Sequence, residues 1–155
     1  MADPDLDPRI ERAMETFNDH EIDAHMEAFA DGATFLDPVL EAPVSGADHR
    51  EYLLDVIEAF PDIRQDVERA VVADGTVAME STFAGTHEGP IEGVPPTGKR
   101  VEVPLASVIT VSEEGITSWR DYWDQATFRE QLGLTFPAVL GQVPGFALWT
   151  IRNRL

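Results

Sequence analysis

The sequence contains no cysteine and only one lysine, Lys99, among its 155 residues. The lack of cysteine excludes disulfides, a thiolate nucleophile and a cysteine-ligated metal site. No apolar run approaches the roughly 20 residues of a membrane span. The N-terminal stretch, residues 1–8, carries acid and proline where a secretory signal needs basic and apolar regions. We therefore expect a soluble cytoplasmic protein with no membrane partner.

Charge of one sign dominates the composition, with 29 acidic residues against 11 basic ones and a net charge of −18. Such a chain repels phosphate backbones, so no nucleic-acid partner is expected. Two explanations of the acidity stay open: a surface that binds cations or a basic partner, and adaptation to high salt. The acids are scattered along the chain and lysine is nearly eliminated, which favours salt adaptation and predicts a haloarchaeal source.

The length and the 43% apolar share are those of one folded domain. We predict a single domain over residues 1–155, with a core at about 8–134 and a C-terminal extension at 135–155. The extension is apolar and is interrupted by Pro144 and Gly145. It is expected to be partly helical and to pack on the body or on a second subunit.

Helical spacing comes first in the chain and period-two alternation follows. The patterns predict helices at about 8–18, 22–29, 48–59 and 126–132, and strands at 33–37, 63–73, 76–87, 100–112 and 116–124. This order indicates an α+β fold with a mostly antiparallel sheet. A long, curved sheet with the N-terminal helices on its concave side forms a cone, and its apolar interior predicts a pocket for a small hydrophobic molecule.

The stretch I116-T-S-W-R-D-Y-W-D124 alternates like a strand and puts Trp119, Asp121 and Trp123 on one face. Between two indoles a carboxylate loses solvation, which raises its pKa toward neutrality and suits it to proton abstraction next to a carbonyl. The alternatives are an exposed strand carboxylate or a pair with Arg100. The sequence favours a pocket role for Asp121.

Two further polar residues have both a catalytic and a structural interpretation. His87 follows a strand and could exchange protons with Asp121 or cap the loop after it. Asp37, before Pro38, could be a second pocket carboxylate or an Asx turn that starts a loop. The predicted catalytic residues are Asp121 and His87, and the predicted substrate-binding residues are Trp119, Trp123, Phe35, Asp37, Phe83, Ser81 and Tyr52.

Several motifs carry a family resemblance: F29-A-x-G-A-T-F-L-D-P38, A59-F-P-D62, T86-H-E-G89, G93-V-P-P-T-G98 and W119-R-D-Y-W-D124. Together they resemble the SnoaL-like polyketide cyclases, which belong to the nuclear transport factor 2-like fold, over residues 8–134. The resemblance implies a pocket enzyme with no cofactor and no metal. It also implies an aspartate that acts as general acid/base in an intramolecular aldol ring closure, and Asp121 matches that aspartate by position.

The last strand is similar also to the limonene epoxide hydrolase branch of this fold, which implies an Asp-Arg-Asp set. Ser81 and Phe83 stand where that set would need arginine and aspartate, and Phe35 and Asp37 replace its tyrosine and asparagine. These replacements count against epoxide hydrolysis. No H-E-x-x-H or G-x-S-x-G motif occurs either, so metal and serine-nucleophile sites have no support.

Residues 101–108 are apolar on both strand faces, which predicts a homodimer that covers the outer face of the sheet. The sequence as a whole favours aldol-type cyclisation or isomerisation of a small hydrophobic carbonyl compound. Two alternatives from other classes remain open: a non-catalytic carrier of a small molecule, and a purely structural dimeric module.

Overall fold

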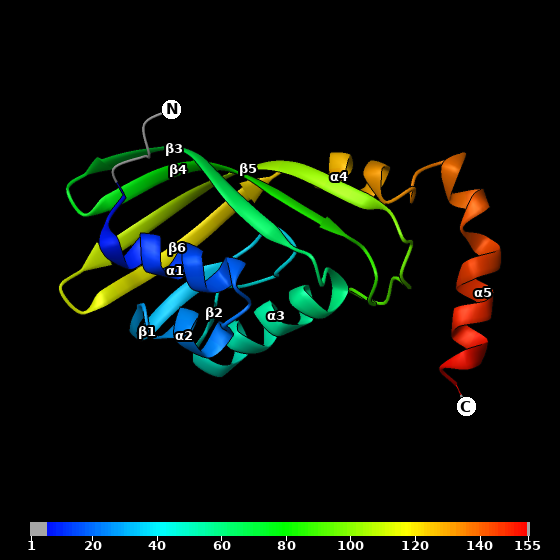
Figure 1. Ribbon diagram of the computed structural model, residues 1–155, viewed down its shortest axis with the longest axis horizontal. Helices are drawn as coiled ribbons and strands as arrows, with labels where there is room; N and C mark the ends of the chain where they lie inside the picture. The colour runs from blue at the N-terminus through cyan, green and yellow to red at the C-terminus, as the bar shows by residue number, and fades with distance from the viewer. Residues whose placement is uncertain (1–5, 155) are drawn as a thin grey trace.

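A computed structural model describes residues 6–154, so most of the stretch that argues against a secretory signal lies outside the described residues. The helices are α1 Pro8–Asn18, α2 Ile22–Met26, α3 Gly46–Ala59, α4 Gln125–Gln131 and α5 Val143–Arg152, with a 3₁₀ helix η1 at Ala138–Gly141 (Figure 1). The strands are β1 Phe29–Leu36, β2 Val44–Ser45, β3 Arg64–Ala73, β4 Thr76–Thr86, β5 Arg100–Ser112 and β6 Gly115–Trp123. Among residues 6–154, no helix is long and apolar enough to cross a membrane.

The strands form one six-stranded sheet in the order β2-β1-β6-β5-β4-β3. Only the β1–β6 pair is parallel, and the other four pairs are antiparallel. The sheet curves around α1, α2 and α3 and does not close into a barrel (Figure 1). The predicted α+β class, with a mostly antiparallel sheet and N-terminal helices on one side, is confirmed.

The connection between α2 and β1 differs from the predicted one. The second helix ends at Met26, and Phe29 already pairs with Ile116 of β6. Asp31-Gly32, which follows the predicted helix at 22–29, lies at a break in the β1–β6 register, with Gly32 at φ +74°. A glycine with positive φ fits an extra residue into a strand, so the same dipeptide serves as a bulge.

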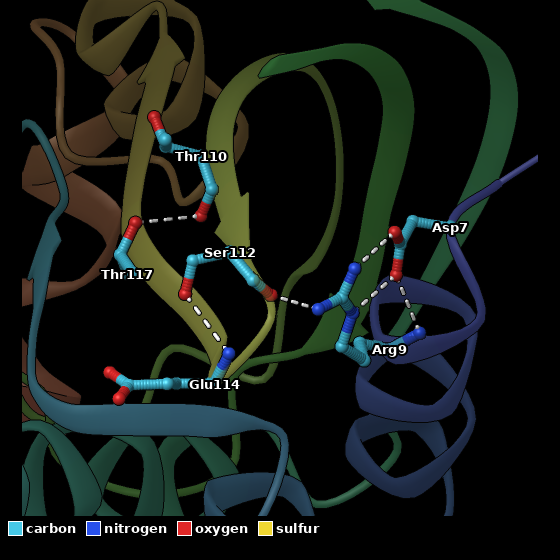
Figure 2. Close-up of polar contacts among 6 residues, drawn as sticks. All are labelled: Asp7, Arg9, Thr110, Ser112, Glu114 and Thr117. Atoms are coloured by element: carbon cyan, nitrogen blue, oxygen red, sulfur yellow. Dashed lines mark hydrogen bonds and ion pairs between the residues drawn. The ribbon is translucent and has the colours of Figure 1, made fainter. Parts of the chain in front are cut away.

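The N-terminus of α1 is fixed to the sheet by polar contacts (Figure 2). Asp7 caps the helix by accepting the backbone N–H of Arg9 at 3.0 Å, and the Arg9 guanidinium donates to both oxygens of Asp7. The same guanidinium donates to the carbonyl of Ser112 at the end of β5. These bonds hold α1 against the β5–β6 turn, where its apolar face closes one side of the cone.

The apolar interior falls into two groups of buried side chains. One joins α1 to β1, β4, β5 and β6, and its largest members are Ile10, Met14, Phe35, Met79, Ile109 and Trp119. The other lies beneath α3 and includes Phe17, Leu53, Phe60, Ile63, Val103 and Leu132. Tyr52 of α3 packs against both groups, so this helix bridges the two halves of the core.

The C-terminal extension departs from the body. Helix α5 stands beyond the end of the sheet and none of its residues is buried (Figure 1). Its apolar side chains include Leu148 and Ile151, which are 63% and 62% exposed. The expectation that this segment packs on the body is therefore wrong, because the chain leads α5 away from the sheet. Packing on a second subunit stays a prediction.

Candidate active site

A cavity of about 390 Å³ lies between the concave face of the sheet and the N-terminal helices. This volume lies within the roughly 300–1,000 Å³ of small-molecule sites. Nine aromatic side chains line it: Phe17, Phe29, Phe35, Tyr52, Phe60, Phe83, Trp119, Trp123 and Phe128. Its polar lining includes Asp37, Asp121, Gln65 and His25. The cavity is therefore apolar, with a few polar groups that can orient a ligand.

Asp121 lies in this cavity, on the face of β6 that the alternation predicted. Its Oδ1 accepts two hydrogen bonds, from the Ser107 hydroxyl at 2.5 Å and from the Trp119 indole N–H at 2.8 Å. Burial raises the pKa of Asp121 to about 7, and the negative charge of Asp37 adds to this rise. The two hydrogen bonds oppose it, because they stabilise the ionised carboxylate. At neutral pH this carboxyl group can accept or donate a proton.

Asp37 supplies a second carboxyl group to the cavity. Its Oδ2 accepts the Trp123 indole N–H at 2.9 Å, and its Oδ1 accepts the backbone N–H of Val39 at 3.0 Å. Both interpretations of Asp37 therefore apply, since the Asx turn and the position in the cavity use different oxygens. Burial raises the pKa of Asp37, while hydrogen bonds from Trp123, Val39 and Tyr52 lower it in part.

Tyr52 reaches the same end of the cavity from α3. The pKa of its phenol is raised well above the usual value, first by burial and then by the negative charges of Asp37, Asp121 and Glu92. Tyr52 therefore stays protonated, and its single O–H can be donated either to Asp37 or, in place of that bond, to a ligand oxygen.

Seven of the nine predicted site residues line the cavity: Asp121, Trp119, Trp123, Phe35, Asp37, Phe83 and Tyr52. Ser81 does not belong to this set. It is buried on β4, where its hydroxyl accepts a hydrogen bond from the Gln65 side chain at 2.9 Å. Gln65, which sequence reasoning missed, lies between Ser81 and the cavity. The structure therefore does not place Ser81 in the cavity lining, where its predicted substrate contact would need it.

His87 also lies away from the cavity lining, which corrects its predicted direct exchange of protons with Asp121. Its ring is fully buried and stacks on Phe60, with 5.3 Å between ring centroids. The Nδ1 atom accepts the backbone N–H of Thr97 at 3.2 Å, and burial lowers the pKa of the ring. His87 thus holds the loop at residues 88–98, which was the structural interpretation of this residue.

Ser107, the hydrogen-bond partner of Asp121, is a second residue of the site that the sequence analysis missed. It is the one polar residue of the inward row of β5, whose other members are Val101, Val103, Leu105 and Ile109. A lone hydroxyl in an apolar row is a usable signal, because a buried polar group needs a hydrogen-bond partner. The alternative pair of Asp121 with Arg100 is absent, since the nearest acidic partner of Arg100 is Asp62 at 3.7 Å. Among residues 6–154 no three His, Asp or Glu side chains gather closely enough to hold a metal ion.

The fold and the cavity define a class of protein: a curved α+β sheet that encloses a small-molecule pocket with a carboxylate on its last strand. The family model of the SnoaL-like polyketide cyclases matches residues 9–132, and the chain belongs to this family. A comparison with curated protein sequences found no significant match.

Solved structures with the same fold cover several described activities. IdmH from Streptomyces antibioticus, a candidate polyketide cyclase, is 25% identical with a TM-score of 0.71, over 81% of this chain and 96% of its own. AclR from Streptomyces galilaeus, a candidate hydroxylase, is 21% identical with a TM-score of 0.73, over 83% and 95%. A protein from Catenulispora acidiphila with a ketosteroid isomerase-like fold, in complex with trimethylamine, is 22% identical with a TM-score of 0.69, over 84% and 94%.

Proposed function

We propose that this protein is an enzyme that abstracts a proton alpha to a carbonyl of a small hydrophobic substrate, leading to aldol-type cyclisation or isomerisation. Asp121 is the general base. The observation that carries this proposal is the Asp121 carboxylate, which has a pKa of about 7 inside an aromatic cavity. A base with a pKa near the working pH combines ionisation with basicity, as proton transfer from carbon requires.

In the proposed reaction the C–H bond next to the carbonyl breaks and its proton moves to the free oxygen of Asp121. The bonding electrons shift to the carbonyl oxygen and form an enolate, to which the Tyr52 phenol can donate a hydrogen bond. In cyclisation the enolate carbon attacks a second carbonyl of the same substrate, and the resulting alkoxide takes up the proton from Asp121, which restores the carboxylate. In isomerisation the proton returns to a different carbon. Neither route consumes an oxidant or a reductant.

Two further observations support a pocket for a small molecule. A protein with the same fold, described as ketosteroid isomerase-like in fold, is described in complex with trimethylamine. The cavity of this chain has no arginine or lysine in its lining among the described residues, so it lacks the Asp-Arg-Asp set of the epoxide hydrolase alternative. Proton abstraction at carbon needs only the carboxylate.

Exchange of alpha protons with solvent deuterium tests the proposal before the natural substrate is identified. A panel of cyclic and aromatic ketones in D₂O would be followed by proton NMR with wild-type protein and with Asp121→Asn. Exchange by the wild type that falls by about 10²-fold or more in the variant is expected for a general base. Ligand binding without exchange in either protein would instead favour the non-catalytic carrier.

A further inference from the structure

Among the described residues, the ionisable groups that line the cavity are five carboxyl groups, the phenol of Tyr52 and the imidazole of His25. Burial lowers the pKa of His25, so it stays neutral near pH 7 and only the carboxyl groups carry charge there. Besides Asp37 and Asp121, the lining includes Asp55, Glu58 and Glu92, which are exposed and therefore lie at its opening. The lining contains no lysine and no arginine among the described residues. The negative charges of three of the five, Asp37, Asp121 and Glu92, raise the pKa of the Tyr52 phenol, and Asp37 also raises the pKa of Asp121.

Five of the ten arginines form ion pairs with acidic residues outside the cavity, and no arginine of the described residues lines the cavity. The ion pairs in the described part of the chain are Arg9–Asp7, Arg50–Asp23, Arg64–Asp66, Arg69–Glu80 and Arg100–Asp62. None of the five acidic partners in these ion pairs lines the cavity. A carboxylate removed from water without a nearby cation is costly, so Asp37 and Asp121 leave an uncompensated negative potential in the cavity.

The aromatic lining favours the same kind of ligand. The faces of aromatic rings carry a negative quadrupole and attract a cation, and aromatic cages bind quaternary and protonated amines. Each of the two indoles also points its N–H at a carboxylate, Trp119 at Asp121 and Trp123 at Asp37. The N–H edge of each indole therefore lies at a carboxylate, so a cation bound there would contact the carboxylate directly and would meet ring faces among the other aromatic residues of the lining.

We propose that the cavity selects substrates with a positively charged amine on an apolar carbonyl framework, and that the Asp37–Asp121 end receives the amine. This inference rests on the proposed function for the position of the reacting site. The amine would lie beside the carboxylates while the carbon next to it lies within reach of Asp121. A neighbouring cation favours the ionised form of Asp121 and so keeps the base ready to accept a proton.

The acidity of the whole surface is a different explanation for a preference for cations. Measurements at high salt separate this explanation from an effect of the cavity. Exposed carboxylates attract cations at long range, and molar salt screens this attraction over about 3 Å. Carboxylates inside a cavity act on a ligand in direct contact and are screened much less. A preference for a cation that persists in molar salt therefore comes from the cavity.

The test compares two probes of the same shape that differ in charge, 3-(trimethylammonio)phenol and 3-tert-butylphenol. Binding to the full chain would be followed by titration of the tryptophan indole N–H signals in NMR, at pH 6 and pH 8, in 2 M salt. We expect the cationic probe to bind roughly tenfold more tightly or better. Its affinity should rise from pH 6 to pH 8 as Asp121 ionises, while that of the neutral probe stays constant.

Paired variants locate the effect. Asp37→Asn with Asp121→Asn should remove the preference for the cation and leave the neutral probe bound. Glu113→Gln with Glu114→Gln removes two exposed carboxylates from the β5–β6 turn and should leave the preference intact. Equal affinity of wild type for both probes, no binding of either probe, or an equal loss in both double variants would overturn the inference.

The proposed function fails separately. If the wild type binds both probes equally, its exchange of alpha protons in neutral ketones can still be measured and the proposed function can still hold. If the wild type shows no exchange, its preference for the cationic probe can still be measured.

Discussion

Ser107 of β5 and Asp121 of β6 are partners in the antiparallel ladder, and the Ser107 hydroxyl donates to Asp121 Oδ1 at 2.5 Å. Directly opposed residues of neighbouring strands have side chains on the same face of the sheet, so the register itself delivers this donor to the carboxylate. The bond stabilises the ionised form and lowers the pKa of Asp121, against burial, which raises it. The pKa of about 7 is thus a balance that single substitutions can move in either direction.

Ser107→Ala should raise the pKa of Asp121 further, because it removes a hydrogen bond to the ionised form. The pKa of Asp121 should rise by roughly one unit, as measured by the carboxyl carbon chemical shift over a pH titration. The pH profile of alpha-proton exchange should move to higher pH by the same amount. Ser118→Ala is a matched control, since Ser118 lies on the opposite face of β6. An unchanged pKa in Ser107→Ala would show that this hydroxyl does not hold the carboxylate.

Asp37→Asn should shift the same pKa downward. The negative charge of Asp37 raises the pKa of Asp121, so its removal makes Asp121 easier to ionise. The rate of alpha-proton exchange, which rises with pH as Asp121 ionises, should then begin to rise at lower pH than in wild type. This shift is opposite to that of Ser107→Ala. The amide has a single oxygen, so it can accept only one of the two hydrogen bonds that Asp37 receives, from Trp123 at Oδ2 or from Val39 at Oδ1. Shifts of the same sign in the two variants would contradict this electrostatic account.

Asp121→Asn should stabilise the folded protein at alkaline pH. The pKa of Asp121 is raised on folding from 3.8 to about 7. The contribution of its protonated form to the free energy of unfolding is therefore fully present below about pH 3.8 and is lost as the pH rises to 7. An asparagine does not ionise and avoids this loss, which reaches up to about 4 kcal/mol at pH 8. Thermal unfolding should show Tm raised by roughly 3–10 °C at pH 8 and by much less at pH 5. A lower Tm of the variant at pH 8 would refute the raised pKa.

Much of the fold and part of the site follow from the pattern of side chains. Strand alternation in residues 116–124 places Asp121 between two tryptophans, and the structure puts all three in the cavity. The pKa direction follows from that environment alone. Short elements could not be predicted in this way. Strand β2 has only two residues, Val44 and Ser45, and so short a strand shows no periodicity.

Contacts between elements distant in the sequence were not predictable in the same way. His87 shares the parity of cavity-facing residues on β4, yet it follows the strand, and the loop at 88–98 folds back over its ring. The partnership of Ser107 with Asp121 depends on the register of β5 against β6, which shifts between Thr110 and Val111. Sequence alternation fixes the face of a residue, whereas its partner depends on this register.

The C-terminal segment has a composition unlike the rest of the chain. All 29 acidic residues precede residue 131, while residues 131–155 contain only Arg152 and Arg154 as charged residues. In the same segment Phe136, Leu140, Leu148 and Ile151 are each more than 60% exposed. An apolar, basic helix beside a strongly acidic body lacks the charged surface that keeps the rest of the protein in solution.

We expect α5 to pack on a second copy of this chain, whose acidic body complements Arg152 of the helix and Arg154 just after it. Sedimentation in molar salt should give a dimer for the wild type and a monomer for Leu148→Glu with Ile151→Glu, because two carboxylates on the apolar face oppose burial. Asn153→Glu adds a charge at the exposed C-terminal end of the same helix and should leave the dimer intact. A wild type that sediments as a monomer at every accessible concentration would exclude this assembly. A dimer that survives both charges would place the interface on the outer face of the sheet, where Val108 and Tyr122 are 41% and 49% exposed.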